Sequence, residues 1–311
     1  MKHQTIEEVV EAFTSLKAKE PLIHVIPNSV TASFCADALS SLGARSVMAV
    51  SPSEVAEITA HSDCVVLNLG QPTEEKLFAL KYSLTAATKY HKSIVFDPVG
   101  AGASSYRRDA IKDIMSIPWK GIIKGNMSEI QSILTKELQY NGVDDAHSLT
   151  DNHTIEDKHP LDFSHNLMNL TQLMKAEGLP STQEYNLPTP YTGKSKITID
   201  KTLAITGASD FVISKEYMAS LNHKNNLTYK LVGAGCVAGC LCGAYAAFTD
   251  DFSAAVAGLS TLSLASRIAY TRANGYGDYK VHVLNALGEI TSPMLKDYLS
   301  EILIIQEEPQ S

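Results

Sequence analysis

Short runs of apolar, mostly β-branched residues alternate with longer segments of mixed polarity along much of the chain. Short apolar runs bounded by Gly, Pro, Asn or Asp are typical of buried strands. Their alternation with helix-length segments predicts βαβ units and a mainly parallel sheet, hence an α/β fold. The predicted strands are residues 22–26, 46–50, 64–69, 93–96, 121–124 and 202–205.

Three segments carry the pattern of helices. Residues 1–20 place apolar side chains at helical spacing among four glutamates, which predicts an amphipathic helix and not a signal or transit peptide. After Asp251 the chain reads as helical to its end, with a packed helix over residues 254–273 and an amphipathic one over residues 292–305. We therefore expect a cytoplasmic protein.

Over about residues 144–196 the sequence becomes polar and shows no regular spacing of apolar residues. Such a stretch is typical of an insertion or a loosely ordered connection, so we expect one domain over residues 1–311 that carries this insertion. Its scattered histidines favour solvated surface positions over a metal site. They are His147, His153, His159 and His165.

Four of the predicted strands are followed or ended by a polar residue. In parallel sheets, ligands gather beyond the carboxyl ends of the strands, so these residues are candidate site positions. They are Asn28, Asp97, Asn126 and Thr206.

Residues 231–248, LVGAGCVAGCLCGAYAAF, place a Gly-Ala-Gly turn directly before a run of small apolar residues. Glycines let the backbone turn tightly, and the first free N–H groups of a helix attract anions. A thiol at this point, Cys236, is expected to be unusually acidic. Three alternatives compete: a membrane-spanning helix, a metal or cluster site, and plain core packing. Packing is the preferred interpretation for Cys240 and Cys242.

Composition narrows the function classes. The 311 residues carry a formal charge of −8, which argues against a nucleic-acid-binding surface. Aspartates at 250 and 251 and the absence of a basic flank argue against a membrane span in residues 231–248. The five cysteines form no framework typical of secreted proteins and fit a reducing compartment.

Two motifs place carboxylates at strand ends. FDPVGAGA puts Asp97 at the end of an apolar strand, where it could hold magnesium beside a polyphosphate or simply form a turn before Pro98. KGNMSE sets Lys124 and Glu129 around a second strand end. Two carboxylates and a lysine at neighbouring strand ends favour a metal–nucleotide site.

Together these motifs give a specific resemblance. PLIHVIPNSVTASF, VMAVSPSEV, VLNLG, VFDPVGAGASSYR, IKGNMSEI, AITGASDFV and VGAGCVAG follow in this order. The series resembles the hydroxyethylthiazole kinase family, whose members have the ribokinase-like fold. The resemblance implies a three-layer α/β ribokinase-like fold with a central, mostly parallel sheet. It also implies a homotrimer, with ATP as co-substrate and Mg²⁺ as cofactor.

The activity implied is transfer of the ATP γ-phosphoryl group to the primary alcohol of 4-methyl-5-(2-hydroxyethyl)thiazole. By this resemblance, the glycine turn is the anion hole for the migrating group, and Cys236 stands where most ribokinase-like enzymes carry an aspartate base. The catalytic set is Gly233, Ala234, Gly235 and Cys236.

The resemblance also assigns the binding residues. Magnesium and its waters would be organised by Asp97 and Glu129. The expected ATP-binding residues are Lys124, Asn126, Thr206 and Gly207. The expected acceptor-binding residues are Asn28, Met48 and Gly233.

Three departures keep other hypotheses open. Lys124 stands where the family usually has arginine, and a lysine lacks the bidentate fork of that group. Ala234 replaces a threonine inside the turn, and Ser29 and residues 32–33 are smaller than is common in the family. A kinase for another small alcohol, such as hydroxymethylpyrimidine, and a non-catalytic ligand-binding relative are therefore the alternatives.

Overall fold

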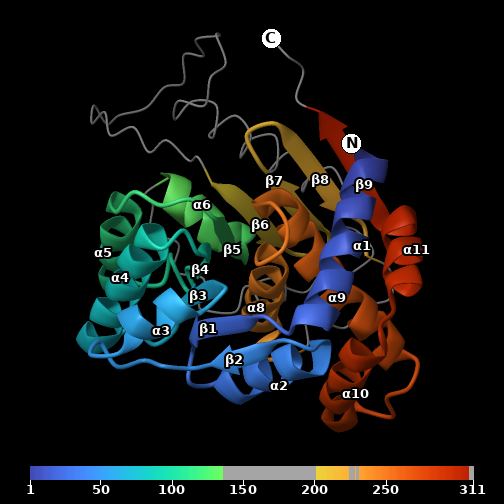
Figure 1. Ribbon diagram of the computed structural model, residues 1–311, viewed down its shortest axis with the longest axis horizontal. Helices are drawn as coiled ribbons and strands as arrows, with labels where there is room; N and C mark the ends of the chain where they lie inside the picture. Colours follow the sequence, from blue (N-terminus) through green and yellow to red (C-terminus); the bar gives the residue numbers. More distant parts are fainter. Residues whose placement is uncertain (136–200, 224–227, 229–230, 308–311) are drawn as a thin grey trace, which may run out of the picture.

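The structure, a computed structural model, describes residues 1–135, 201–223, 228 and 231–307 (Figure 1). The predicted insertion at residues 144–196 lies outside the described residues. The strands form one nine-stranded sheet in the order β2-β1-β3-β4-β5-β6-β7-β8-β9. Its middle strands are buried on both faces, as expected for apolar runs in an α/β sheet.

The first six strands of the sheet are parallel, which confirms the predicted βαβ organisation. They are β1 (Leu22–Ile26), β2 (Arg45–Val47), β3 (Cys64–Asn68), β4 (Ser93–Asp97), β5 (Ile122–Asn126) and β6 (Thr202–Thr206). Strand β2 is shorter than predicted. Beyond it, the Ala49 carbonyl accepts a hydrogen bond at 2.9 Å from Nε2 of the buried His24 and does not extend the ladder.

The other three strands are antiparallel, and the pattern analysis missed them. They are β7 (Asp210–Ile213), β8 (Tyr217–Leu221) and β9 (Leu303–Glu307). The predicted helix over residues 292–305 was wrong at its end, because the helix stops at Ile302 and the following residues form β9, which pairs with β8. Leu303 is fully buried whereas Ile304 is 49% exposed, the alternation of a strand and not of a helix.

Helices cover both faces of the sheet, which confirms the three-layer architecture (Figure 1). One face packs against α3 (Val55–His61), α4 (Glu74–Lys89), α5 (Ser105–Ser116) and α6 (Met127–Thr135). The other packs against α1 (Lys2–Lys19), α2 (Ala32–Leu42), α8 (Ala234–Ala246), α9 (Asp251–Tyr270), α10 (Tyr276–Glu289) and α11 (Ser292–Ile302).

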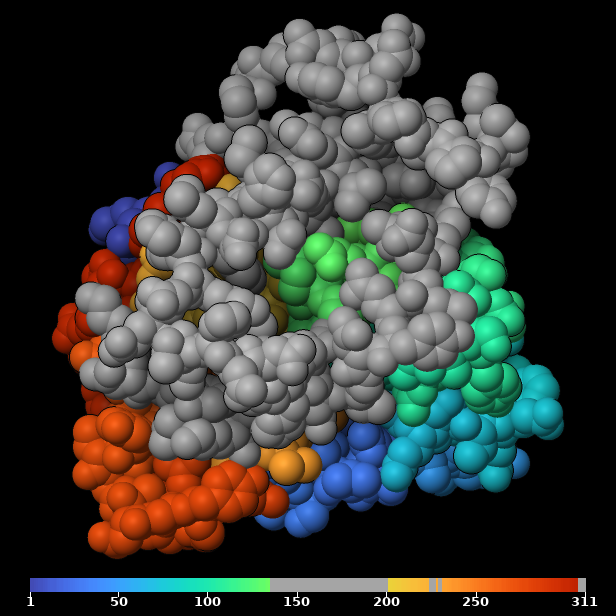
Figure 2. Space-filling view, turned by 180° about the vertical axis from the view of Figure 1, so that it is seen from behind, coloured from blue at the N-terminus to red at the C-terminus, as the bar shows by residue number. Residues whose placement is uncertain are grey.

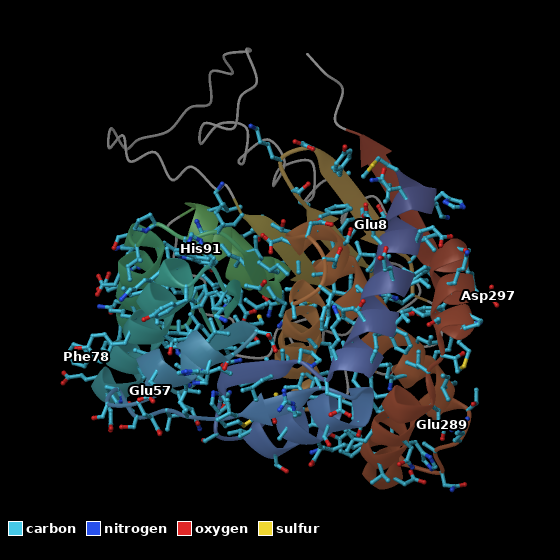
Figure 3. All side chains as sticks on the ribbon, in the orientation of Figure 1. Glu8, Glu57, Phe78, His91, Glu289 and Asp297 are labelled. Atoms are coloured by element: carbon cyan, nitrogen blue, oxygen red, sulfur yellow. The ribbon has the colours of Figure 1, made fainter. Side chains whose placement is uncertain are left out.

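The outer surfaces of these layers carry exposed charged side chains. Glu57 on α3 and Asp297 on α11 are exposed and project from opposite sides of the molecule (Figure 3). From behind, α10 lies beside α2 at the lower end of the molecule (Figure 2). There the ammonium of Lys280 sits 4.3 Å from the ring centre of Phe34. Helices α2 and α10 therefore pack against each other at this end of the second layer.

Among the described residues, α9 is the one helix that is long and apolar enough, by length and composition, to cross a membrane. Its apolar window is 89% buried inside the fold, against α8, α10 and the sheet. Helix α8 has 13 residues, fewer than a bilayer requires. The helical part of residues 231–248 therefore forms a core helix.

The glycines of α8 and α9 let this core close. A Cβ on Gly243 would lie 2.7 Å from Cγ2 of Val66 in the sheet, and one on Gly258 would lie 2.4 Å from the backbone nitrogen of Cys242. Both distances are far below carbon–nitrogen or carbon–carbon contact. These glycines thus let α8 lie in close contact with both the sheet and α9.

We expect Gly258→Ala to lower the free energy of unfolding by about 1–3 kcal/mol, because the added methyl overlaps the α8 backbone. Gly277→Ala in α10 is the matched control, since nothing lies within 4 Å of a Cβ there and alanine favours helix. Urea unfolding followed by circular dichroism measures both. Equal stability of the two variants would contradict the close contact.

Candidate active site

The predicted site residues lie along the carboxyl edge of the parallel sheet. Asp97, Asn126 and Thr206 are the last residues of β4, β5 and β6, and Asn28 follows β1 by two residues. This position is the one predicted from the strand pattern. The amino end of α8 lies at the same edge, where the sulfur of Cys236 is 3.2 Å from Nδ2 of Asn68, the last residue of β3.

The glycine turn before α8 has the geometry of an anion-binding helix start. Gly233 caps the helix with φ of 89°, and a Cβ there would lie 2.6 Å from Cγ2 of Thr31. The first bond inside the helix runs from the Val237 amide to the Gly233 carbonyl at 3.0 Å. The amides of Gly235 and Cys236 precede it, so they are the donors that a helix start offers to a ligand.

Lys124 lies beneath this helix start. Its side chain is only 4% exposed, and its Nζ is 3.5 Å from Oδ2 of Asp97. A Cβ on Gly235 would approach Nζ to 2.9 Å, so the lysine occupies the space that a side chain at 235 would fill. Burial alone would lower its pKa, but the carboxylates of Asp97 and Glu129 raise it. A permanent positive charge therefore stands below the first amides of α8.

The two carboxylate oxygens of Asp97 differ: one accepts a hydrogen bond and the other, called uncommitted below, has no partner among the described residues. Oδ2 accepts from Nδ2 of Asn68 at 3.1 Å and faces Lys124, while Oδ1 is buried and has no hydrogen-bond partner among the described residues. Burial raises the pKa of Asp97, and the charge of Lys124 opposes this. A buried acceptor without a donor is a rare feature that fits an oxygen-seeking cation such as Mg²⁺.

Glu129 has a different surrounding. Its Oε2 accepts from the amide of Asn126 at 2.8 Å, and Oδ1 of Asn126 accepts from the amide of Glu129 at 2.8 Å. This reciprocal pair is a capping box at the start of α6. The second oxygen, Oε1, accepts from the amide of Gly100 at 2.8 Å. Glu129 therefore joins the turn after β4 to the start of α6.

The side-chain oxygen of Asn126 consequently accepts the helix-capping hydrogen bond and does not face an open nucleotide surface. Both oxygens of Glu129 already accept amide hydrogens, so contact with a metal would run through water. In contrast, Asp97 keeps a whole oxygen uncommitted within the described residues. The two carboxylates that looked equivalent in sequence thus have different environments.

Cys236 is not acidic in this structure, so the expectation of an unusually acidic thiol was wrong. Burial raises its pKa to about 12, and the charge of Asp97 adds to the effect, whereas Lys124 opposes it. Its sulfur accepts from Nδ2 of Asn68 at 3.2 Å. Desolvation and the neighbouring carboxylate therefore outweigh the helix start.

The turn that carries Thr206 and Gly207 is held by a buried polar network. The Gly207 amide donates to Oδ1 of Asp210 at 3.0 Å, and Oδ2 of the same aspartate lies 2.8 Å from Nε2 of His223. Ser263 on α9 lies 2.7 Å from the other ring nitrogen of His223. The predicted nucleotide-side turn is thus anchored to β7 and α9.

The expected acceptor-side residues lie at the opposite end of the sheet edge. The amide nitrogen of Asn28 is 2.5 Å from where a Cβ on Gly70 would be, so Gly70 makes room for it after β3. Met48 follows β2, is half-buried and packs against the same core as Cys236. The described contacts join Asn28, but not Met48, to the residues around Cys236.

Sequence reasoning missed two residues of this site. Asn68 ends β3 and donates from Nδ2 toward both Asp97 and Cys236. A polar residue ending an apolar strand, as in VVLNLG, was the available signal. Lys76 on α4 donates to the carbonyls of Pro27 and Gly70, and nothing in its local sequence distinguishes it from other helix lysines.

Comparison with family models matches residues 13–171 and 164–293 to the hydroxyethylthiazole kinase family. The chain belongs to this family. Curated relatives agree over nearly the full length. A hydroxyethylthiazole kinase of Leptospira biflexa is 30% identical over 303 residues, covering 96% of this chain and 99% of the relative. One from Clostridium botulinum is 27% identical, covering 96% and 97%.

The fold agrees as well. The structure of a hydroxyethylthiazole kinase protein from Pyrococcus horikoshii matches with a TM-score of 0.75 and 25% identity, covering 97% of this chain and 99% of that one. A hypothetical protein from Streptococcus mutans, SMU.573, matches with a TM-score of 0.51 at 11% identity, which supports the fold alone. The predicted family and fold class are confirmed.

We expect Asp210→Ala to lower the free energy of unfolding by about 1–3 kcal/mol, because it leaves the Gly207 amide and the His223 ring without their acceptor. Asp109→Ala is the control: Asp109 pairs with Lys112 but is 68% exposed, so its loss should cost under about 1 kcal/mol. Urea unfolding of both variants tests this. A neutral Asp210→Ala would contradict the anchoring role.

Proposed function

We propose that this protein transfers the γ-phosphoryl group of ATP to the primary alcohol of 4-methyl-5-(2-hydroxyethyl)thiazole, giving the thiazole phosphate used in thiamine synthesis. Its family and the names of its full-length relatives support this reaction. The observation that carries the proposal is the helix start of α8, whose first amides lie above the buried Lys124 and beside Asp97. Phosphoryl transfer requires positioning and charge neutralisation of this kind.

The strand order suggests where the two substrates bind. Along the carboxyl edge, Met48 follows β2 and Asn28 follows β1, whereas Asn126 and Thr206 end β5 and β6. The Asp97 carboxylate, at the end of β4, stands between the two groups. We therefore assign the acceptor to the β2–β1 end and ATP to the β5–β6 end, where Lys124, Asn126, Thr206 and Gly207 lie.

The chain's own groups would act chiefly through charge. The amides of Gly235 and Cys236 donate to the migrating phosphoryl oxygens, with the helix dipole behind them. Lys124 adds a full charge from below and needs no reorganisation, because Asp97 and the glycines of α8 hold it in place. Gly233 and Ala234 shape the turn that brings these amides to the acceptor.

Magnesium fits the residues that are present. Asp97 would hold it through the uncommitted Oδ1, and Glu129 would reach it through water, since its own oxygens accept from Asn126 and Gly100. When bound, the ion supplies neutralisation of the phosphate charge. The other ligands of such an ion would be water and the phosphates of ATP, as is usual for Mg²⁺.

We further propose a cytoplasmic homotrimer whose subunit contacts lie beside the acceptor end. Val30 is 66% exposed and Val232 is 64% exposed, and these two residues flank the Asn28 and Gly233 backbone. Exposed apolar residues next to a site are typical of surfaces covered by a partner. The formal charge of −8 gives no support to nucleic-acid binding.

The activity is tested by incubating the purified protein with Mg-ATP and either hydroxyethylthiazole or hydroxymethylpyrimidine while ADP is measured. ADP formation with the thiazole alcohol alone supports the proposal. Turnover with the pyrimidine alone would instead assign the alternative kinase activity. Thermal stabilisation by a ligand without ADP formation would indicate a binding protein.

We expect Cys236→Ala to lower kcat while leaving the KM for ATP nearly unchanged, because the sulfur lies beside Asp97 and Asn68 on the acceptor side of Lys124. A loss of about 10²-fold or more is the size of a general-base contribution, which requires the thiol to ionise in the complex with both substrates because burial raises its pKa here. Cys242→Ala is the control, since this thiol is buried against α9 and should leave kcat unchanged. An unchanged kcat in Cys236→Ala would remove the general-base role.

A further inference from the structure

Lys76 is a second lysine at the same sheet edge that no part of the expected site uses. It lies in the first turn of α4, where its own amide donates to the capping Thr73 hydroxyl at 3.2 Å. Its ammonium donates to the carbonyl of Pro27 at 2.6 Å and to the carbonyl of Gly70. The lysine thereby ties the loop after β1 to the loop after β3.

Three contacts connect these loops to the reacting end of the site. The Gly70 amide donates to Oδ1 of Asn68 at 2.8 Å, and Nδ2 of Asn68 donates to the sulfur of Cys236 at 3.2 Å. Gly70 also packs against the side-chain amide of Asn28. Lys76 is therefore connected through Gly70 to Asn68, which donates to both Asp97 and Cys236.

Lys76 interacts electrostatically with charged and titratable groups of the site. Burial lowers its pKa to about 8, and the neighbouring Arg107 lowers it too, whereas Cys236 and Asp97 raise it. A lysine that loses its aqueous surroundings shifts in this direction unless an anion stabilises it. Two of the groups that act on it, Cys236 and Asp97, lie at the helix start that forms the anion hole.

No carboxylate neutralises Lys76 within the described part of the chain. Lys124 has Asp97 at 3.5 Å, and Lys81 on the same helix has Asp113 at 2.6 Å, but the contacts of Lys76 are two carbonyl oxygens. An ammonium has three N–H groups, so one remains after these two bonds. A partly buried cation with a spare donor is suited to an anionic ligand.

We propose that Lys76 binds the phosphoryl group on the acceptor side of the site, during transfer and in the thiazole phosphate product. This inference rests on the proposed function. The bond between the γ-phosphorus and the oxygen of ADP breaks, and the bond to the alcohol oxygen forms. The alcohol proton passes to water, or to Cys236 once its thiol has ionised in the complex with both substrates, and Lys76 keeps its own proton. Lys124 and Lys76 then flank the anion hole from the nucleotide and acceptor sides.

Lys76→Met removes the charge and keeps the apolar stem, and Lys81→Met is the matched control on the same helix. We expect Lys76→Met to lower kcat about 10²-fold, the size measured for one lost donor to a developing oxyanion. The Kd of thiazole phosphate, measured by calorimetry, should rise about 10-fold or more, while the Kd of ADP and the KM for the thiazole alcohol change little. Lys81→Met should match the wild type.

Two results would overturn the inference. One is an unchanged kcat and product Kd in Lys76→Met. The other is equal weakening of the thiazole alcohol and its phosphate, which would make Lys76 only a clamp between the Pro27 and Gly70 loops. If Lys76→Met does not fold, Lys76→Gln provides the same comparison, because its amide can still donate to a loop carbonyl without a charge.

The wild-type enzyme separates this test from that of the proposed function. If it phosphorylates a different alcohol, the thiazole assignment fails, and the Lys76 variants are then compared with that alcohol and its phosphate. A selective loss of affinity for the phosphorylated form supports the role of Lys76 whichever alcohol is used. An absence of this selectivity contradicts it.

Discussion

The buried ion pair between Lys124 and Asp97 is the interaction on which the rest of the site depends. It sets a full positive charge below the first amides of α8 and leaves one carboxylate oxygen uncommitted among the described residues. Charges removed from water are expensive unless they are paired and held, and removing one partner of such a pair is typically strongly destabilising. The pair is held because β4 and β5 are neighbours in the sheet and because Gly235 and Gly239 leave room for the lysine.

The same need for close approach explains the composition of α8. Its glycines face Lys124, Asp97 and the side chains of β3 and β4, and α9 presses against its other side through Gly258. A helix this deeply buried must be apolar all round, which is why its sequence resembles a membrane span. Its apolar character therefore follows from its place between the sheet and α9.

The structure also separates residues that look alike in sequence. Asp97 and Glu129 both lie at the ends of apolar strands. The oxygens of Glu129 accept from two backbone amides and join the turn after β4 to the start of α6. Asp97 instead faces Lys124 and the anion hole. Cys236 sits at a helix start, where a thiol is expected to be acidic, but burial and the Asp97 charge raise its pKa. For Asp97 and Cys236 the decisive neighbours come from other strands, whereas Glu129 is held by its own helix start and by the turn after β4.

The sequence by itself determined the parallel half of the sheet, the amphipathic first helix, the family and the strand ends at which the site lies, because these depend on local periodicity and short motifs. It did not determine β7, β8 and β9. Strands β7 and β8 are short and form a local hairpin that the apolar pattern did not mark, whereas β9 pairs with β8 far along the chain, as Leu303 with Leu221. Only the tertiary structure brought Asn68 to Cys236 and Lys76 to the Pro27 loop. Hydrogen bonding and desolvation act through space, so the state of a buried charge is decided by neighbours that no local pattern records.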